Sequence, residues 1–278
     1  MQNNDQIRIP VIHITSRRSI APDLREIWAY RELLYFLTLR DIKIRYKQTL
    51  IGVAWAVLQP VMTTAVFTII FSGFARFDTS NIPYPLFVLS GMLIWTFTQG
   101  SITIASNSFV NNTNLVTKVF FPRLIVPLAA TFAGILDLVI GLLVLLALMA
   151  YYRPDITKQM VLAPLFLVMA LVLTAALGTL LSAVNVRFRD VKFALPFLLQ
   201  VWMIASPVFY PASLLSGKWR LIFAVNPMTG ILEGFRSALL GSQFDWEVIG
   251  ISAAVIAVIS IISLFVFRRM EDDFADQI

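Results

Sequence analysis

The stretch Leu138-Val139-Ile140-Gly141-Leu142-Leu143-Val144-Leu145-Leu146 has no polar side chain at any position. It does not alternate between apolar and polar residues, as the strands of a membrane β-barrel do. It lies within residues 124–152, where Asp137 is the single charged residue. A helix needs about 20 apolar residues to cross the hydrocarbon core, and its backbone must satisfy its own hydrogen bonds there. We therefore predict a membrane-spanning helix in this segment.

The composition extends this conclusion to the whole chain. Of its 278 residues, 58% are hydrophobic and 14% are charged, and the mean hydropathy is +0.80. An average soluble protein carries roughly a quarter charged residues, and a soluble core of this size could not bury so much apolar surface. These values exclude a cytosolic enzyme, a disordered chain and a nucleic-acid-binding domain. The chain has no cysteine and a single histidine, His13, so we expect neither disulfides nor a metal site, and no cofactor.

Five further segments are apolar over a length that can cross a bilayer. We predict an all-α membrane protein with six transmembrane helices, at about 50–72, 85–106, 123–150, 160–184, 193–210 and 247–267. Residues 1–49 then form an N-terminal segment, and residues 268–278 form a short tail. With both termini on one side, the segments on that side contain 16 of the 22 Lys and Arg residues. The positive-inside rule therefore places both termini in the cytoplasm.

Residues 22–47 have the pattern of an amphipathic helix that lies in the membrane interface. Asp23 and Glu26 are placed to cap its first turn, and an apolar face follows. A cationic cluster ends the segment, with Arg40, Lys43, Arg45 and Lys47. These cations either anchor the helix among lipid head groups or bind a phosphate-bearing substrate at a cytoplasmic entrance, and the two roles are compatible.

The segment 107–122 is unusual for a cytoplasmic connection because it is both polar and aromatic. Leu115, Val116, Val119, Phe120 and Phe121 would be out of place in a free loop. They indicate a short helix across the membrane surface that docks into a partner. The alternative is a loop packed against the protein's own helices.

On the opposite side, residues 211–245 are irregular, with prolines and glycines between short apolar pieces. We predict one or two re-entrant or interfacial helices here. Glu233 and Arg236 are three residues apart on one helical face and can pair. The pair is either structural or part of an outer gate.

Two sets of residues inside the spans are candidates for contact with a substrate. Asp137 is a carboxylate within a span, a functional candidate by default, although a structural role inside the bundle is favoured because no Lys, Arg or His lies in the neighbouring spans. Aromatic rings pack against sugar faces and amides bond hydroxyls. The second set can therefore line a path for sugars, and it consists of Trp55, Gln59, Trp95, Gln99, Trp202, Phe209 and Tyr210. The alternative is an aromatic belt at the membrane interfaces.

A series of short motifs resembles one known family. The motifs are RYKQTLIGVAWAVLQP at 45–60, YPLFV at 84–88, NLVTKVFFPR at 114–123, NVRFRDV at 185–191, NPM at 226–228 and EGFR at 233–236. In this order they resemble the permeases of polysaccharide-exporting ABC transporters, with members of the O-antigen export type most similar. Permeases for capsular polysaccharide and teichoic acid are relatives. The resemblance covers essentially residues 25–273.

The resemblance implies a transport permease in the bacterial inner membrane, not an enzyme. It implies a homodimer that associates with two copies of a separate ABC-type ATPase, is surrounded by membrane lipids and exports a polysaccharide linked to undecaprenyl diphosphate. The segment 107–122 would be the coupling helix, contacting the ATPase through Asn111, Asn114, Leu115, Val116, Lys118, Phe120 and Phe121. The segment 211–245 would form periplasmic gate helices, with Pro227, Glu233 and Arg236. An ion-coupled secondary transporter is the less favoured alternative, and a membrane scaffold without transport is another.

Overall fold

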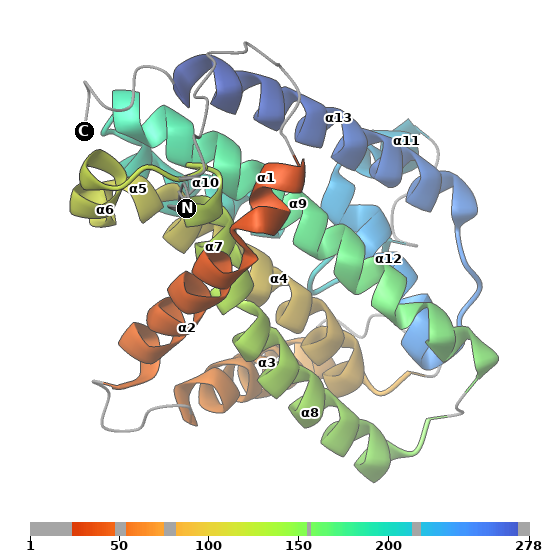
Figure 1. Cartoon of the computed structure of the whole chain (residues 1–278). Coiled ribbons are helices and arrows are strands. Elements are labelled where there is room, and N and C mark those ends of the chain that lie inside the picture. Colours follow the sequence, from red (N-terminus) through yellow and green to blue (C-terminus); the bar gives the residue numbers. More distant parts are fainter. Residues whose placement is uncertain (1–23, 48–53, 75–81, 155–156, 213–217, 272–278) are drawn as a thin grey trace, which may run out of the picture.

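The computed structural model describes residues 24–47, 54–74, 82–154, 157–212 and 218–271, and these ranges contain helices and turns but no strand (Figure 1). The prediction of an all-helical fold is confirmed. The elements are α1 (Leu24–Ala29), α2 (Arg31–Lys47), α3 (Ala54–Phe74), α4 (Tyr84–Ser106), α5 (Ser108–Asn111), α6 (Thr113–Lys118), α7 (Ile125–Ala133), α8 (Ile135–Tyr152), the 3-10 helix η1 (Lys158–Leu162), α9 (Ala163–Arg187), α10 (Val191–Ile204), α11 (Lys218–Ala224), α12 (Pro227–Leu240) and α13 (Trp246–Glu271).

Parts of several sequence predictions fall on residues outside these ranges. They are the N-terminal segment before residue 24 with its capping residue Asp23, the predicted start of the first span at 50–53, residues 213–217 of the gate segment, and the tail beyond residue 271. The other predicted elements can be compared with the structure directly.

Four helical segments of the described chain are long and apolar enough to cross a membrane. They are Tyr84–Ser106, Ile125–Tyr152, Lys158–Arg187 and Trp246–Glu271. Two further apolar helical pieces, Ala54–Ile70 and α10, are shorter. The structure therefore establishes a multi-helix membrane protein with four candidate spans. The six-span topology remains a prediction.

Helix α4 is the central element of the bundle and packs against α3, α7, α8, α9, α10 and α12 (Figure 1). Most of its side chains are buried, including polar ones such as Thr98 and Ser101. It is also the least apolar of the four candidate spans. A helix surrounded by protein can carry such residues because its polar groups do not face hydrocarbon.

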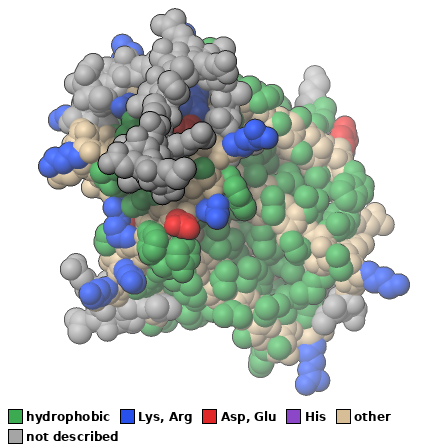
Figure 2. Space-filling view, in the orientation of Figure 1, with side chains coloured by type: hydrophobic (Ala, Val, Ile, Leu, Met, Phe, Trp, Pro, Cys, Tyr) green, Lys and Arg blue, Asp and Glu red, His purple; other side chains and the backbone are tan. Residues whose placement is uncertain are grey.

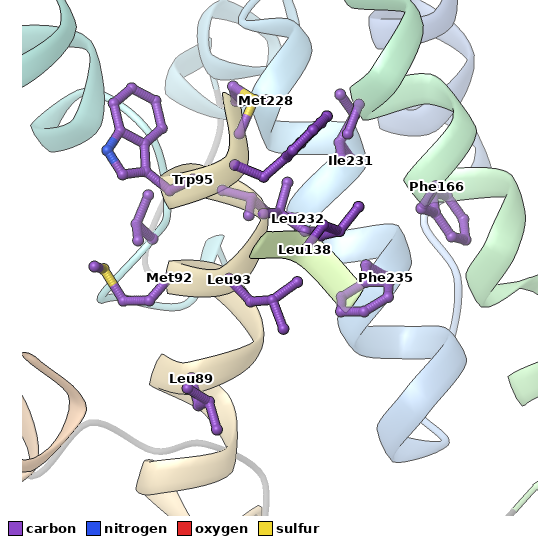
Figure 3. Packing of buried hydrophobic residues seen from close by; sticks show 14 of the residues in the cluster. Leu89, Met92, Leu93, Trp95, Leu138, Phe166, Met228, Ile231, Leu232 and Phe235 are labelled. Carbon is purple, nitrogen blue, oxygen red and sulfur yellow. The ribbon is translucent and has the colours of Figure 1, made fainter. Parts of the chain in front are cut away.

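The main hydrophobic core lies between α4, α8, α9 and α12. Figure 3 shows Leu93 of α4 near Leu232 and Phe235 of α12, and Trp95 of α4 belongs to the same cluster. Helix α12 also approaches α9 closely at Gly234, where a Cβ atom would overlap the ring of Phe166. The absence of a side chain at this position therefore allows the two helices to touch.

A second hydrophobic cluster lies where α2, α5, α7, α9 and α13 meet. Its buried members include Leu37 of α2, Phe109 of α5, Val186 of α9 and Phe267 of α13. The rings of Phe109 and Phe267 stack at a centroid distance of 6.0 Å. This cluster attaches the amphipathic helix α2 and the short helices α5 and α6 to the long helices of the bundle.

The predicted single helix across 107–122 is wrong in one respect: the structure has two short helices, α5 and α6, separated at Asn112. The Asn112 side chain donates to the carbonyl of Ser108 at 2.7 Å. Asparagine side chains compete with the backbone for such hydrogen bonds and favour helix ends over helix interiors. A run of four Asn and Thr residues at 111–114 therefore interrupts the helix.

Three other helices end or break earlier than their sequence patterns predicted. The amphipathic segment divides into α1 and α2 at Tyr30, and α10 ends at Ile204, six residues before the predicted end of the fifth span. The third span divides at Gly134 into α7 and α8. This break places Asp137 in the first turn of α8, where a carboxylate interacts favourably with the helix dipole.

Candidate functional site

A cavity of about 580 Å³ lies between α2, α3, α4 and α8. Helix α3 contributes Trp55, Ala56, Gln59, Pro60, Thr63 and Phe67, and α4 contributes residues from Met92 to Ile104. Arg45 and Tyr46 come from the last turn of α2, while Asp137, Leu138 and Gly141 come from α8. Met203 of α10 and Phe209 beyond it complete the wall. Most of these side chains are apolar or neutral.

Five of the seven residues predicted to line a path do line this cavity: Trp55, Gln59, Trp95, Gln99 and Phe209. Trp202 lies behind the wall, with its ring edge-on to that of Trp95 at 5.4 Å, and its Nε1 donates to Asn226 Oδ1 at 2.9 Å. The Tyr210 hydroxyl donates to the carbonyl of Ile204 at 3.1 Å. Trp202 and Tyr210 are therefore absent from the lining of the cavity.

The neutral part of the cavity offers flat rings and amide groups. Trp95 Nε1 donates to Gln99 Oε1 at 2.7 Å, and this bond leaves the Gln99 amide nitrogen directed to other acceptors. Trp55 is half exposed, at 52% of its surface. An indole face with nearby amides has the chemistry that binds sugar rings and their hydroxyls.

The two ends of the cavity differ in chemistry. Near the start of α3, Arg45 Nη1 donates to Asp137 Oδ2, and the Tyr46 hydroxyl donates to Asp137 Oδ1. About three helical turns further along α3, Phe67 stacks on Phe209 with centroids 3.8 Å apart and planes 11° apart. The cavity thus carries charged groups at one end and stacked aromatic rings at the other.

The ion pair gives Asp137 a partner that the sequence interpretation did not include. That interpretation considered only the neighbouring spans, whereas Arg45 belongs to the amphipathic helix α2. The two residues are 92 positions apart in the chain, so no local pattern could join them. Tyr46 was missed for the same reason.

The other predicted entrance cations lie outside the cavity. Arg40 donates to Asp41 Oδ1 at 2.8 Å, and Lys43 and Lys47 are exposed. Figure 2 shows Lys and Arg side chains gathered on the side of α1, α2, α5 and α6, whereas hydrophobic side chains cover much of the remaining visible face. Of the four predicted cations, the structure brings Arg45 alone into the cavity.

The α5–α6 segment presents a mixed surface beside these cations. Val116 and Phe121 are buried in the second hydrophobic cluster, and Leu115 is half-buried against it. Phe120 is 73% exposed, and the predicted contact residues Asn111, Asn114 and Lys118 are exposed as well. The buried residues hold the segment in place, and the exposed ones are available to another molecule.

The predicted gate segment contains α11 and α12, and Arg236 fixes α12 to its surroundings. The predicted pairing with Glu233 is confirmed at 3.2 Å. Arg236 also donates to the carbonyls of Pro207 and Val208, both at 2.6 Å, and its guanidinium lies 3.7 Å from the centroid of the Phe87 ring. Burial lowers the pKa of Arg236 and Glu233 opposes this effect.

Pro227, the third predicted gate residue, is buried in the first turn of α12, where a proline is tolerated because its missing amide hydrogen has no partner there. The preceding Asn226 caps the helix by accepting from the amide of Met228 at 3.1 Å. Among the described residues, no group of three His, Asp or Glu side chains could hold a metal ion.

The described chain is thus a bundle of apolar helices with a cavity between α2, α3, α4 and α8. Residues 32–240 match the family model described as ABC-2 type transporter, and the chain belongs to this family.

Several curated proteins are similar over most of the chain. One is "O-antigen export system permease protein RfbA" of Myxococcus xanthus, 30% identical over 258 residues, which covers 92% of this chain and 98% of the relative. A protein of the same name from Klebsiella pneumoniae is 24% identical over 247 residues, covering 88% of this chain and 94% of the relative. "Polysialic acid transport protein KpsM" of Escherichia coli is 25% identical over 238 residues, covering 83% and 88%.

Proposed function

We propose that the chain is the permease subunit of an ABC exporter that moves O-antigen-type polysaccharide, linked to undecaprenyl diphosphate, across the bacterial inner membrane. Membership of the ABC-2 type transporter family and two relatives named as O-antigen export permeases support this function. The aromatic and amide lining of the cavity is suited to sugars. Capsular polysaccharide is the alternative substrate, because another relative is named for polysialic acid transport.

The energy for transport comes from a separate ATPase subunit in this proposal. The sequence has no G-x-x-x-x-G-K-[ST] loop with which to bind nucleotide phosphates. Two ATPase subunits would bind a homodimer of the chain from the cytoplasmic side, where both termini lie. The short apolar helices α3 and α10 would then complete a six-span subunit.

The observation that carries the proposal is the exposed Phe120 on a firmly held segment. The Phe120 side chain is 73% exposed, in a segment that also exposes Asn111, Asn114 and Lys118. The adjacent Phe121 is 5% exposed and fixes the backbone. An apolar side chain displayed in this way fits a pocket of a protein partner, since such anchors contribute most to interfaces when they are fully covered.

The test replaces Phe120 with Asp and measures ATPase binding and transport-coupled ATPase activity in the complex with the ATPase encoded beside the permease. Phe188→Asp is the matched control, because Phe188 is also exposed, at 57%, in the connection after α9. A buried interface anchor contributes about 2–4 kcal/mol, so Phe120→Asp should weaken ATPase binding at least tenfold. Unchanged binding, or an equal loss in both variants, contradicts the assigned docking segment.

The same preparation separates an ABC exporter from an ion-coupled transporter. Reconstituted export should stop when ATP is removed and persist when the proton gradient is collapsed. Export that survives ATP removal but needs the gradient would support the ion-coupled alternative instead. Normal surface polysaccharide in a deletion strain would support a scaffold.

A further inference from the structure

The charged end of the cavity contains the ion pair between Arg45 and Asp137, which a ligand in the cavity can reach. Arg45 and Asp137 keep 25% and 27% of their side-chain surface exposed. An ionisable side chain that faces a cavity inside a membrane protein is a functional candidate by default. This pair opens onto a volume of about 580 Å³.

The pair is also chemically isolated within the cavity. Among the described residues that line it, Arg45 and Asp137 are the charged ones, and the others are apolar or neutral. The Arg45 guanidinium can donate two parallel hydrogen bonds to a phosphate as readily as to a carboxylate. Asp137 therefore occupies the position that an anionic ligand of Arg45 would take.

We propose that Asp137 is an exchangeable counter-ion of Arg45. In the empty cavity the carboxylate holds the guanidinium, and a diphosphate head group displaces it on binding. The proposal rests on the proposed function, because it assigns the site at which the diphosphate of a lipid-linked substrate is recognised. It makes Asp137 a competitor for every anionic ligand of Arg45.

The preference for a diphosphate over a phospholipid phosphodiester follows from their charges. A phospholipid phosphodiester carries one negative charge, as Asp137 does, so the exchange replaces one singly charged partner by another and gains little Coulomb energy. Asp137 is also tethered beside Arg45, which gives it a high effective concentration. A diphosphate carries at least two negative charges and more acceptor oxygens, so it competes successfully. Displacing the resident carboxylate weakens the binding of either ligand by the same factor, so the cavity is occupied by the diphosphate, which binds Arg45 more tightly, and not by the membrane phospholipids.

Tyr46 positions the carboxylate for this exchange. Its hydroxyl donates to Oδ1 while Arg45 donates to Oδ2, so both oxygens are held on one side of the cavity. When a ligand takes Arg45, Asp137 keeps the Tyr46 hydrogen bond and is not left without a partner. This second donor lowers the cost of releasing the guanidinium, because an unpaired buried carboxylate would be strongly unfavourable.

The experiment measures binding of two water-soluble probes to the detergent-solubilised full-length protein, by quenching of its tryptophan fluorescence. The probes are farnesyl diphosphate and dihexanoyl phosphatidylglycerol, and the dissociation constant of each probe is compared between the wild type and the variants. In Asp137→Asn both dissociation constants should fall by about fivefold to tenfold, because neither probe then has to displace the carboxylate. In Arg45→Gln, binding of the diphosphate should weaken about tenfold.

Asp41→Asn is the matched control. It frees Arg40, a neighbouring guanidinium of the same helix paired at 2.8 Å but outside the cavity, and it should leave both dissociation constants unchanged. Asp137→Glu keeps the competing charge and should keep both dissociation constants close to those of the wild type. Dissociation constants that are unchanged in Asp137→Asn, or that fall equally in Asp41→Asn, overturn the proposal.

Two further outcomes are decisive. If Asp137→Asn does not fold, Arg45→Gln decides the matter, since unchanged diphosphate binding in this variant also overturns the proposal. Failure of the wild-type protein to bind farnesyl diphosphate overturns it as well. The ATPase-coupling experiment with Phe120 uses neither probe, so it can fail while Asp137→Asn tightens probe binding, or succeed while that variant leaves probe binding unchanged.

Discussion

Replacement of Arg236 by Met should destabilise the protein strongly, because this guanidinium joins three parts of the chain. It is 3% exposed and donates to the carbonyls of Pro207 and Val208 in the turn after α10. It also pairs with Glu233 of its own helix and lies over Phe87 of α4. Met keeps the length of the side chain and removes the donors.

The magnitude can be worked from these contacts. Each hydrogen bond from a charged donor contributes about 1.5–3 kcal/mol, and removing one partner of a buried ion pair costs about 3–5 kcal/mol. These losses overlap, since the same side chain makes all the contacts, and Glu233 can turn towards solvent. We expect a loss of about 3–5 kcal/mol in the free energy of unfolding, which corresponds to a decrease in Tm of about 6–15 °C in a domain of comparable size.

Thermal unfolding of the detergent-solubilised variant, followed by tryptophan fluorescence, measures this decrease. Arg220→Met is the matched control, because Arg220 pairs with Asp245 and Glu247 at an exposed position. Exposed pairs contribute little to stability, so Tm should not change measurably. Hydrogen exchange in residues 205–212 should accelerate in the Arg236 variant alone. A Tm for Arg236→Met within about 2 °C of wild type would refute the reasoning.

Two other substitutions test the packing of α12. Gly234→Val should lower Tm by several degrees because its side chain would overlap the Phe166 ring. Gly250→Val is the control and should be tolerated, because no atom lies within 4 Å of a Cβ at that position. Equal decreases in Tm in the two variants would contradict this packing. Asn226→Ala removes a helix cap and the acceptor of Trp202 Nε1, at a cost of about 1–3 kcal/mol. Asn226→Asp keeps the acceptor oxygen but loses the donor that bonds the Ala205 carbonyl and Ser206 Oγ, so it should not restore the wild-type Tm; an unchanged Tm in Asn226→Ala would argue against these contacts.

The local parts of the fold could be predicted because local sequence determines them. The helices at 84–106 and 246–271 begin within about a residue of their predicted positions, since apolar length and periodicity specify a membrane helix without reference to its neighbours. The breaks at Asn112 and Gly134 were not predicted. At both positions the chain can either continue the helix or form a local turn that ends it. Hydropathy does not measure the difference in free energy between these two conformations.

The site was predictable as a set of residue types but not as an arrangement. Aromatic and amide residues on α3 and α4 indicated a path, and five of the seven candidates line one cavity. Asp137 was recognised as unusual, but its partner Arg45 comes from a helix outside the spans. Likewise, Glu233 three residues before Arg236 suggested a pair, whereas the carbonyls of Pro207 and Val208 carry no signature in the sequence. Such contacts are fixed by tertiary packing alone.

The central position of α4 has a consequence for biosynthesis. This helix leaves the ribosome before α7, α8, α9, α10 and α12, which later cover it. During that interval its buried polar groups, such as Thr98 and Ser101, have no protein neighbours from those helices. Because unpaired polar groups are costly in hydrocarbon, α4 should be less stable in the bilayer alone than after those helices cover it. Its final stability in the membrane then depends on helices that are synthesised after it.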